Sequence, residues 1–328
     1  MSGSEAQASR AVLMIRPAHF GANVETAASN FFQGAATGLG DVARIAQREF
    51  DALALALADA GVRVHQWSGQ RNAALPDEVF PNNWLSLHAD GTAVLYPLLA
   101  QSRRRERRPE LLAELERTHG YRIGRVVDLT ALESRGEYLE GTGSLVLDRA
   151  RRVAYACRSP RTTAAALTEF GAKLDYEIVA FDALDRAGRP IYHTNVLLSV
   201  GTRFAALCSA AIRDPAERRR VCARLESSGH ELVDLGLDEL ERFAGNLLEL
   251  AGNDGPVIAL SRSALASLAA PTRGALERHG RLVAADVSTI ERVGGGSVRC
   301  MLAEIALPAA VSSGSAPAET SRPKSARN

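Results

Sequence analysis

The stretch NLLELAGNDGPVIAL (residues 246–260) consists of two short apolar runs on either side of a tight turn. The turn residues Asn253-Asp254-Gly255 tolerate positive φ angles, and short apolar runs that flank such a turn predict a β-hairpin. A helix within Ser263–His279 and a strand at Leu282–Val287 follow. The stretch therefore predicts a strand-strand-helix-strand unit.

The same order of elements recurs along the chain. Hairpins of this kind start near residues 83, 143, 195, 246 and 297, at intervals of 60, 52, 51 and 51 residues. The fifth unit is split, because its strand Val298–Ile305 is expected to pair with the N-terminal strand Ala11–Ile15. Five similar units predict an α/β fold built as a five-bladed, pseudo-symmetric αβ-propeller. Both termini would close the ring.

The two ends of the chain differ from the repeated part. Residues 1–10 are small and polar, and residues 309–328 are rich in Ser, Ala and Pro. Such compositions are typical of disordered segments. We therefore expect a single αβ-propeller domain at residues 11–308 between a disordered N-terminus (1–10) and a disordered C-terminal tail (309–328).

The composition argues against several classes of function. The chain of 328 residues is 46% hydrophobic and 23% charged, with a formal net charge of +1. No global charge therefore favours binding to nucleic acid or to an acidic membrane. The four cysteines show neither a CxxC pair nor zinc-ligand spacing, which indicates reduced thiols in a cytoplasmic protein. Neither a signal peptide nor a transmembrane segment is expected.

The stretch VGGGSVRCMLAEI (residues 293–305) contains a candidate nucleophile. Gly294–Gly296 can adopt positive φ angles and bring backbone N–H groups close to a ligand. Cys300 follows at the start of the predicted strand, beside Arg299. A thiol near backbone donors and a cation is well placed to act as a thiolate. The alternative is a buried thiol that only fills space in the core.

The unusual polar residues share one phase of the repeat, just before or at the first strand of each hairpin. In a radial array one phase corresponds to one end of the central axis, so we expect these side chains to converge on one pocket. Singly, each has a structural alternative, because asparagine suits turns and caps and a histidine can be held in the core. The residues are Asn82, Asn83, Glu140, His193, Asn195, Asn246 and Cys300.

A cysteine, a histidine and a carboxylate in one pocket form an activated nucleophile. The thiolate attacks an electrophilic carbon, and the imidazole passes a proton to the leaving nitrogen and later takes one from water. A papain-like protease uses similar residues, but with its cysteine near a helix start and in another order. Here the order is Glu140, His193, Cys300.

Seven motifs in sequence order resemble those of the amidinotransferase, arginine deiminase and dimethylargininase superfamily, whose members are called penteins. The resemblance covers about residues 11–307 and implies the five-bladed propeller. Three of the motifs are most similar to those of the citrulline-utilisation hydrolases, also called arginine deiminase-related proteins. The motifs are Arg16-Pro17, Phe80-Pro-Asn-Asn-Trp84, Glu140-Gly-Thr-Gly143, Ser159-Pro-Arg-Thr162, Tyr192-His-Thr-Asn195, Gly245-Asn-Leu-Leu-Glu-Leu250 and Gly294-Gly-Gly-Ser-Val-Arg-Cys300.

The resemblance implies a catalytic triad. Cys300 matches the family's nucleophile, His193 its general acid and base, and Glu140 the acid that completes the triad. No metal or organic cofactor is expected for this chemistry.

The resemblance also implies residues that bind the substrate. Arg161 matches an arginine that binds the α-carboxylate, and Asp77 matches an aspartate at the amino-acid end. Arg103 matches a second arginine of the carboxylate region, with a solvated charge at a helix start as the alternative. The full candidate set is Asp77, Asn82, Asn83, Arg103, Arg161, Asn195 and Asn246.

Three departures, which involve four residues, distinguish this chain from relatives that act on guanidinium groups. Those relatives carry carboxylates where this chain has Asn82 and Asn83, and arginine deiminases carry an aspartate at the position of Asn195. The fourth residue of the family's E-G-G-D motif is Gly143 here. Because an amide suits a neutral ureido group better than a cation, these departures favour citrulline over arginine.

We therefore expect a cysteine-dependent hydrolase of non-peptide C–N bonds, with citrulline as the leading substrate and a covalent intermediate on Cys300. The products would be ornithine, carbon dioxide and ammonia. The first alternative is an arginine deiminase, a dimethylargininase or an amidinotransferase. An alternative of another class is a non-catalytic propeller, such as the ribosome anti-association factor that lacks the triad. The expected partner is a small amino acid rather than nucleic acid or membrane, and a homo-oligomer stays open.

Overall fold

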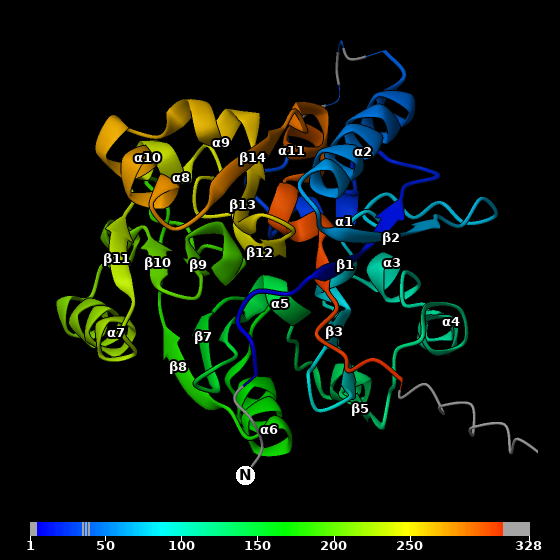
Figure 1. The fold of residues 1–328 in the computed structure, drawn as a ribbon, viewed down its shortest axis with the longest axis horizontal. Helices are drawn as coiled ribbons and strands as arrows, with labels where there is room; N and C mark the ends of the chain where they lie inside the picture. Colours follow the sequence, from blue (N-terminus) through cyan, green and yellow to red (C-terminus); the bar gives the residue numbers. More distant parts are fainter. Residues whose placement is uncertain (1–4, 35, 37, 39, 311–328) are drawn as a thin grey trace, which may run out of the picture.

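The computed structural model describes residues 5–34, 36, 38 and 40–310, which form a mixed α/β fold. Among these residues are five sheets, each of three strands. In every sheet one strand pair is antiparallel and the other is parallel. A parallel pair needs a crossover connection, and each sheet has a helix there. The sheets are distributed around the middle of the molecule, with α2, α4, α6, α7 and α10 on the outside (Figure 1).

The elements follow the repeat. The first sheet contains β1 (Ala11–Arg16), β2 (Arg63–Ser68) and β15 (Ala303–Glu304), with α2 (Val42–Asp59). The second contains β3 (Leu85–Leu87), β4 (Thr92–Leu95) and β5 (Arg125–Asp128), with α4 (Glu110–His119). The third contains β6 (Val146–Asp148), β7 (Val153–Cys157) and β8 (Glu177–Phe181), with α6 (Ala164–Leu174). The fourth contains β9 (Leu198–Val200), β10 (Phe204–Leu207) and β11 (Glu231–Asp234), with α7 (Pro215–Ser227). The fifth contains β12 (Leu248–Gly252), β13 (Gly255–Ser261) and β14 (Arg281–Ala285), with α9 (Arg262–Ser267) and α10 (Ala270–Glu277).

Short helical elements connect these units. They are α1 (Val24–Ala27), η1 (Pro81–Asn83), α3 (Gln101–Arg104), η2 (Thr130–Arg135), α5 (Gly141–Ser144), η3 (Thr194–Val196), η4 (Ser209–Ala211), α8 (Leu237–Leu240), α11 (Ser288–Gly294) and η5 (Val298–Met301), where η denotes a 3₁₀ turn. None of the described helices is both long and apolar enough to cross a bilayer.

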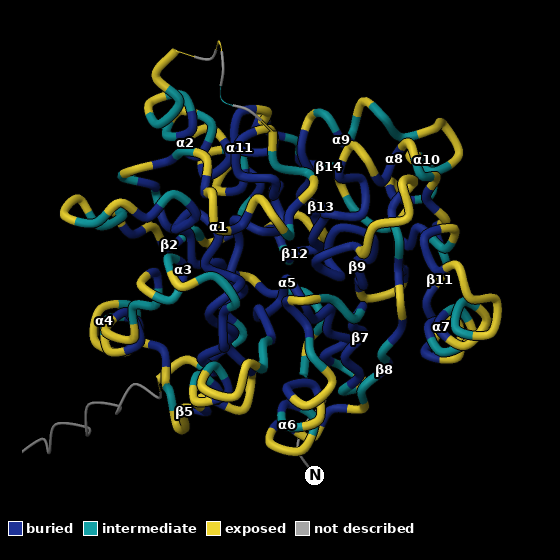
Figure 2. The backbone as a smooth tube through the Cα atoms, turned by 180° about the vertical axis from the view of Figure 1, so that it is seen from behind, coloured by how far each residue is buried: buried dark blue, intermediate teal, exposed yellow. Residues whose placement is uncertain are grey.

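Helix α2 shows how the sequence produces the outer layer. The side chain of Asp41 accepts a hydrogen bond from the backbone N–H of Arg44 and so caps the first turn. Phe50, Leu53 and Leu57 are fully buried at helical spacing, and the opposite side of the helix is exposed. The same division holds around the molecule, because buried residues fill its middle and exposed ones lie on the outer helices and loops (Figure 2).

The split unit of the repeat, whose strands form the first sheet, has the predicted connectivity. Strand β15 pairs antiparallel with β1, with Val12 opposite Glu304, and β2 pairs parallel with β1. The first strands of neighbouring sheets also contact one another, as in the pairs β15 and β3, β6 and β9, and β9 and β12. Segments from both ends of the chain therefore belong to one sheet near the centre.

The prediction of a strand at Val298–Ile305 is wrong for the first half of this range. Residues 298–301 form the turn η5, in which the N–H of Cys300 donates to the carbonyl of Ser297 at 3.0 Å. The strand predicted from Asn195 likewise begins only at Leu198, after η3. These residues are buried on all sides, and a short, wholly buried run has no periodicity that separates a helical turn from a strand.

The N-terminal segment also differs from its expectation over the described residues 5–10. The amide of Gln7 donates to the carbonyls of Leu147 and Val200, both at 2.9 Å, and the hydroxyl of Ser9 donates to the carbonyl of Ile305 at 2.6 Å. Hydrogen bonds to β6, to β9 and to the residue after β15 give this polar segment defined partners that composition alone does not reveal. Residues 311–328, which make up nearly all of the expected C-terminal tail, lie outside the described residues. Residues 1–4 lie outside them as well.

Candidate active site

Short helical turns at the start of the units bring the polar residues of one phase together. Turn α5 packs against both η1 and η3, and η1 packs against η5. Gly141, with a φ of +48°, makes this packing possible, since a Cβ atom there would lie 2.1 Å from the carbonyl oxygen of Asn82. The repeat therefore places its polar phase at one site.

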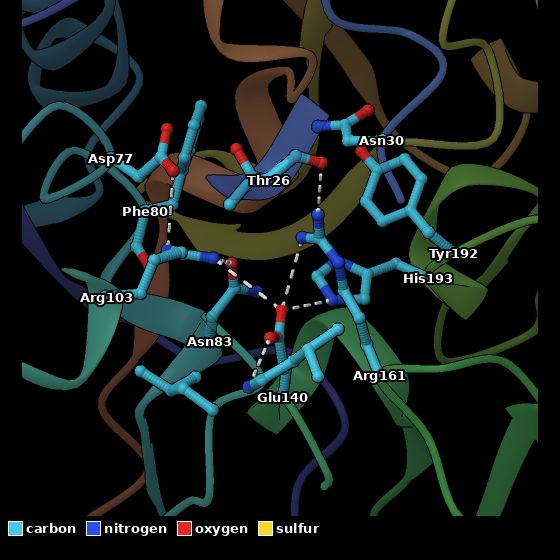
Figure 3. A network of polar contacts seen from close by, with 12 residues as sticks. Thr26, Asn30, Asp77, Phe80, Asn83, Arg103, Glu140, Arg161, Tyr192 and His193 are labelled. Carbon is cyan, nitrogen blue, oxygen red and sulfur yellow. Dashed lines mark hydrogen bonds and ion pairs between the residues drawn. The ribbon is translucent and has the colours of Figure 1, made fainter. Parts of the chain in front are cut away.

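Glu140, His193 and Cys300 are all buried at this site. Glu140 precedes α5, His193 precedes η3, and Cys300 lies within η5. Nε2 of His193 lies 2.9 Å from Oε2 of Glu140, and His193 and Cys300 line the same small cavity. Figure 3 shows the imidazole beside the carboxylate, with two guanidinium groups nearby.

Positive groups surround the Glu140 carboxylate. Burial alone would raise the pKa of Glu140, but Arg161 and His193 outweigh burial and hold that pKa below its ordinary value. Nη1 of Arg161 lies 3.4 Å from Oε2, and Nη1 of Arg103 lies 3.7 Å from the same oxygen. The backbone N–H of Leu99 donates to Oε1 at 3.1 Å. Glu140 is therefore an ionised acceptor for the imidazole.

The imidazole of His193 is neutral in this environment. Burial lowers its pKa to about 4, and the partial compensation by Glu140 is opposed by Arg161 and Arg103. With Nε2 bound to the carboxylate, Nδ1 lies beside Gly143, where a Cβ atom would be 2.7 Å away. Gly143, which departs from the family's E-G-G-D motif, thus leaves the space that the ring occupies.

Two asparagines contact the sulfur of Cys300. Nδ2 of Asn246 lies 3.3 Å from Sγ, and Nδ2 of Asn195 lies 3.5 Å from it. Asn246 is itself held by the carbonyl of Asn195 at 2.9 Å and by the N–H of Arg299 at 3.1 Å. Amide donors at these positions can stabilise negative charge on the sulfur.

Arg161 is held by a segment that the sequence did not point to. Its Nη2 donates to the hydroxyl of Ser29 at 2.8 Å and to the carbonyl of Thr26 at 3.1 Å, and its Nε donates to the same hydroxyl at 3.1 Å. The guanidinium also lies over the ring of Tyr192, 5.0 Å from its centroid. Nε and Nη2 thus point to the same side, and this is a pair of N–H groups with which a guanidinium can hold the two oxygens of a carboxylate.

Asp77 is buried close to the same segment. Asn23 donates to its Oδ2 at 2.8 Å, and Nε of Arg103 lies 3.7 Å from that oxygen. Oδ1 has no hydrogen-bond partner among the described residues. Burial raises the pKa of Asp77 despite Arg103. A cationic group of a ligand would offset this carboxylate.

Arg103 is buried rather than solvated, so the alternative of an exposed helix-start charge is wrong. Nε lies 3.1 Å and Nη2 lies 2.9 Å from the two oxygens of Glu106, and Nη1 donates to Oδ1 of Asn83 at 2.7 Å. Asn82 is buried too, but it does not line the cavity that Asn83 lines. The structure therefore brings together all the predicted site residues except the Asn82 side chain.

The cavity between these residues is small. It leaves about 10 Å³ accessible to the centre of a water molecule, roughly the room for one water. An amino acid as long as arginine can enter only if the lining residues move. A larger depression of about 710 Å³ lies alongside. Phe32 lines it and meets the ring of Tyr192 at 6.1 Å between centroids.

Neither the motifs nor the repeat had assigned several residues to the site. Glu106 lies within a run of arginines that suggests a solvated surface, and the segment 23–30 lies outside the repeat. No group of three or more His, Cys, Asp or Glu side chains suited to a metal ion occurs in the described part of the chain. The residues that no motif indicated are Asn23, Thr26, Ser29, Asn30 and Glu106, and Tyr192 lies in a quoted motif but had no assigned role.

Comparisons with known proteins place this chain within the pentein superfamily. A family model described as N,N dimethylarginine dimethylhydrolase, eukaryotic, matches residues 16–307. The chain therefore belongs to this family. No curated protein sequence matches it significantly.

Solved structures show the same fold at low sequence identity. The apo structure of ArgZ, a cyanobacterial arginine dihydrolase, has a TM-score of 0.68 and 16% identity, over 91% of this chain and 41% of that one. Unliganded AgrE has a TM-score of 0.69 and 17% identity, over 90% of this chain and 39% of that one. A dimethylarginine dimethylaminohydrolase adduct has a TM-score of 0.59 and 17% identity, over 90% and 100%. The chain thus spans about two fifths of full-length ArgZ and AgrE.

Proposed function

We propose that the chain is a cysteine hydrolase that cleaves a C–N bond in the side chain of an arginine-like amino acid, with citrulline as its substrate. The observation that carries the proposal is the buried set at one cavity. His193, bound to Glu140 at 2.9 Å, shares that cavity with Cys300, whose sulfur meets two amide donors. These are the parts that nucleophilic catalysis by a thiol requires.

The proposed reaction has two steps. His193 takes the proton of the Cys300 thiol, the resulting thiolate bonds to the ureido carbon, and the C–N bond to ornithine breaks as His193 passes that proton to the leaving nitrogen. Water then gives a proton to His193 and attacks the carbamoyl-thioester, which releases the thiol and carbamate. Carbamate breaks down to carbon dioxide and ammonia. Glu140 orients the imidazole and stabilises its charged form during the transfers.

The other end of the substrate has two charged partners. We assign its α-carboxylate to Arg161, which would exchange Ser29 and Thr26 for the two carboxylate oxygens. We assign its ammonium group to Asp77, whose Oδ1 is unpartnered among the described residues. This assignment explains why a buried acid with a raised pKa is kept beside the cavity.

The choice of citrulline rests on Asn83, which lines the cavity, unlike the other three asparagines of the predicted set. Asn195 and Asn246 contact the sulfur instead, and Asn82 does not line the cavity. An amide offers no charge to a guanidinium, whereas a neutral ureido group can exchange hydrogen bonds with it. Arginine is the alternative substrate, because ArgZ is described as an arginine dihydrolase and a variant of AgrE was solved with L-arginine.

We also propose that the five sheets are the blades of a five-bladed αβ-propeller formed by residues 11–308 as one domain. Contacts between the first strands of neighbouring sheets, and the sheet shared by both chain ends, support a closed ring. The proposed setting is the cytoplasm, because all four cysteines are free in a chain with no disulfide pattern.

The decisive experiment combines turnover with covalent trapping. Citrulline, arginine, methylarginines and agmatine are offered to the wild type, with ammonia and amine products measured and the quenched protein examined by mass spectrometry. We expect citrulline turnover and a carbamoyl adduct on Cys300. Cys300→Ser should lose about a thousandfold or more in kcat, whereas the control Cys222→Ser, on the outer helix α7, should keep its activity.

A non-catalytic propeller is the competing hypothesis from another class. It predicts no turnover of any compound in the panel and no preference of an electrophilic reagent for Cys300 over the other cysteines. Equal activity of Cys300→Ser and wild type would contradict the covalent mechanism.

A further inference from the structure

Arg103 has little capacity left to bind a substrate. Its Nε and Nη2 face Glu106, Nη1 donates to Asn83, and Nη2 also lies 3.5 Å from the carbonyl of Phe80. The Arg103 and Glu106 side chains are only 2% and 1% exposed. A guanidinium that is surrounded by protein acceptors holds those acceptors in place rather than binding a further carboxylate.

This contact fixes the orientation of the Asn83 amide. A guanidinium has only donors, so Asn83 must turn its oxygen toward Arg103. The amide nitrogen is then on the other side and presents two N–H groups away from Arg103. Nδ2 of Asn83 has no hydrogen-bond partner among the described residues, although the side chain is buried.

The unpartnered nitrogen lies beside the catalytic histidine. A Cβ atom at Gly143 would lie 2.4 Å from Nδ2 of Asn83 and 2.7 Å from Nδ1 of His193, so both nitrogens border the same point. Asn83, His193 and Cys300 also line the same cavity. A buried donor without a partner at this place is a position for an acceptor atom of the substrate.

We propose that Arg103, held by Glu106, is a positioning residue that fixes Asn83 as a hydrogen-bond donor to the substrate and thereby selects a ureido carbonyl over a guanidinium. The proposal rests on the proposed function and adds the residues that determine its specificity. A ureido oxygen accepts from the Asn83 amide, whereas a guanidinium would bring N–H groups against N–H groups and leave both unpaired. Glu140 does not reverse this preference, because Arg161, Arg103 and His193 already surround its charge.

The test measures the ratio of kcat/KM for citrulline to kcat/KM for arginine. Asn83→Ala should lower the ratio about tenfold or more, because one matched hydrogen bond is lost. Arg103→Met combined with Glu106→Leu removes both partners of this contact, so neither polar group is left buried without the other. The double variant should lower the ratio similarly because Asn83 is free to turn. Arg103→Lys keeps a donor-only cation and should retain more of the preference.

A double-variant cycle separates positioning from a general effect on packing. If Arg103 acts through Asn83, adding Asn83→Ala to the Arg103→Met/Glu106→Leu protein should change the ratio no further. The inference is overturned if Asn83→Ala lowers the ratio equally in the wild type and in the Arg103→Met/Glu106→Leu protein. It is also overturned if the Arg103→Met/Glu106→Leu protein keeps the wild-type ratio. In both cases the hydrolase itself stands. A wild type that turns over neither compound overturns the proposed function together with it.

Discussion

Two buried groups of charged residues lie near the centre of the molecule and differ in how fully they are paired. The site cluster comprises Asp77, Arg103, Glu106, Glu140 and Arg161, and Oδ1 of Asp77 within it has no partner among the described residues. The N-terminal cluster comprises Glu5, Arg149, Arg299 and Glu304, and each of its four charged groups has an ionic partner. Incomplete pairing in only one of the clusters marks the place where a ligand is needed.

The balance of charge differs in the same way. The N-terminal cluster has two guanidinium groups and two carboxylates, with Arg149 2.7 Å from Glu5 and 3.4 Å from Glu304. The site cluster has two guanidinium groups against three carboxylates. Burial raises the pKa of Glu106 to about 8, and a protonated Glu106 would remove this excess of one negative charge. An amino acid brings one carboxylate and one ammonium group, so it can pair with Arg161 and Asp77 without changing the net charge of the site cluster.

Breaking the N-terminal cluster should give the largest change in stability. Arg149→Met leaves Glu5 buried without its ionic partner and leaves Glu304 with Arg299 alone, and we expect a loss of about 3–5 kcal/mol in the free energy of unfolding. The control is Arg158→Met, because the Arg158 side chain is 37% exposed, and we expect it to cost less than about 1 kcal/mol. Urea unfolding measures both values. An Arg149→Met protein as stable as the control would show that the cluster has no structural role.

The repeat was sufficient to predict the five units and the convergence of their polar phase. Glu140, His193 and Cys300 were all identified because each lies at the start of a unit. The sequence could not show the contacts of residues that have no regular position in the repeat. Glu106 lies among arginines, and its burial depends on Arg103 folding inward, while Ser29 reaches Arg161 from 132 residues away in the sequence.

The local structure at Cys300 escaped prediction for a different reason. Cys300 lies in a 3₁₀ turn rather than a strand, and that turn orients its sulfur toward Asn195 and Asn246. A run of buried apolar residues is compatible with either conformation. Likewise, no pattern distinguishes Asn83, which lines the cavity, from its neighbour Asn82, which does not.

Changing Arg161 should alter substrate binding far more than the free energy of unfolding, unlike the change of Arg149 in the N-terminal cluster. Arg161→Lys loses the planar fork that can hold both oxygens of a carboxylate. We expect KM for citrulline to rise about tenfold to a hundredfold, the cost of one or two charged hydrogen bonds. The decarboxylated analogue of citrulline is the control substrate, and its KM should change little. Equal increases for the two compounds would show that Arg161 does not bind the α-carboxylate.

The smallest expected effect is the dependence of stability on pH, where two members of the site act in opposite directions. His193 has a pKa of about 4 in the fold against an ordinary value of 6.5, so the unfolded chain binds more protons between these values. Its contribution to stability therefore decreases as the pH falls from 6.5 toward 4. Glu106 has a pKa of about 8 against an ordinary 4.5, so the folded chain binds more protons and this contribution increases as the pH falls from 8 toward 4.5.

The two contributions can be separated with one variant for each residue. Relative to wild type, His193→Asn should become more stable as the pH is lowered from 6.5 to 4.5, because the unfavourable protonation of the unfolded histidine is gone. Glu106→Gln should become less stable over the same interval, because the favourable proton uptake of the folded chain is gone. Urea unfolding at both pH values measures these differences, and Arg158→Met should show neither trend. The same trend in both variants would contradict the opposite directions of the two pKa shifts, downward for His193 and upward for Glu106.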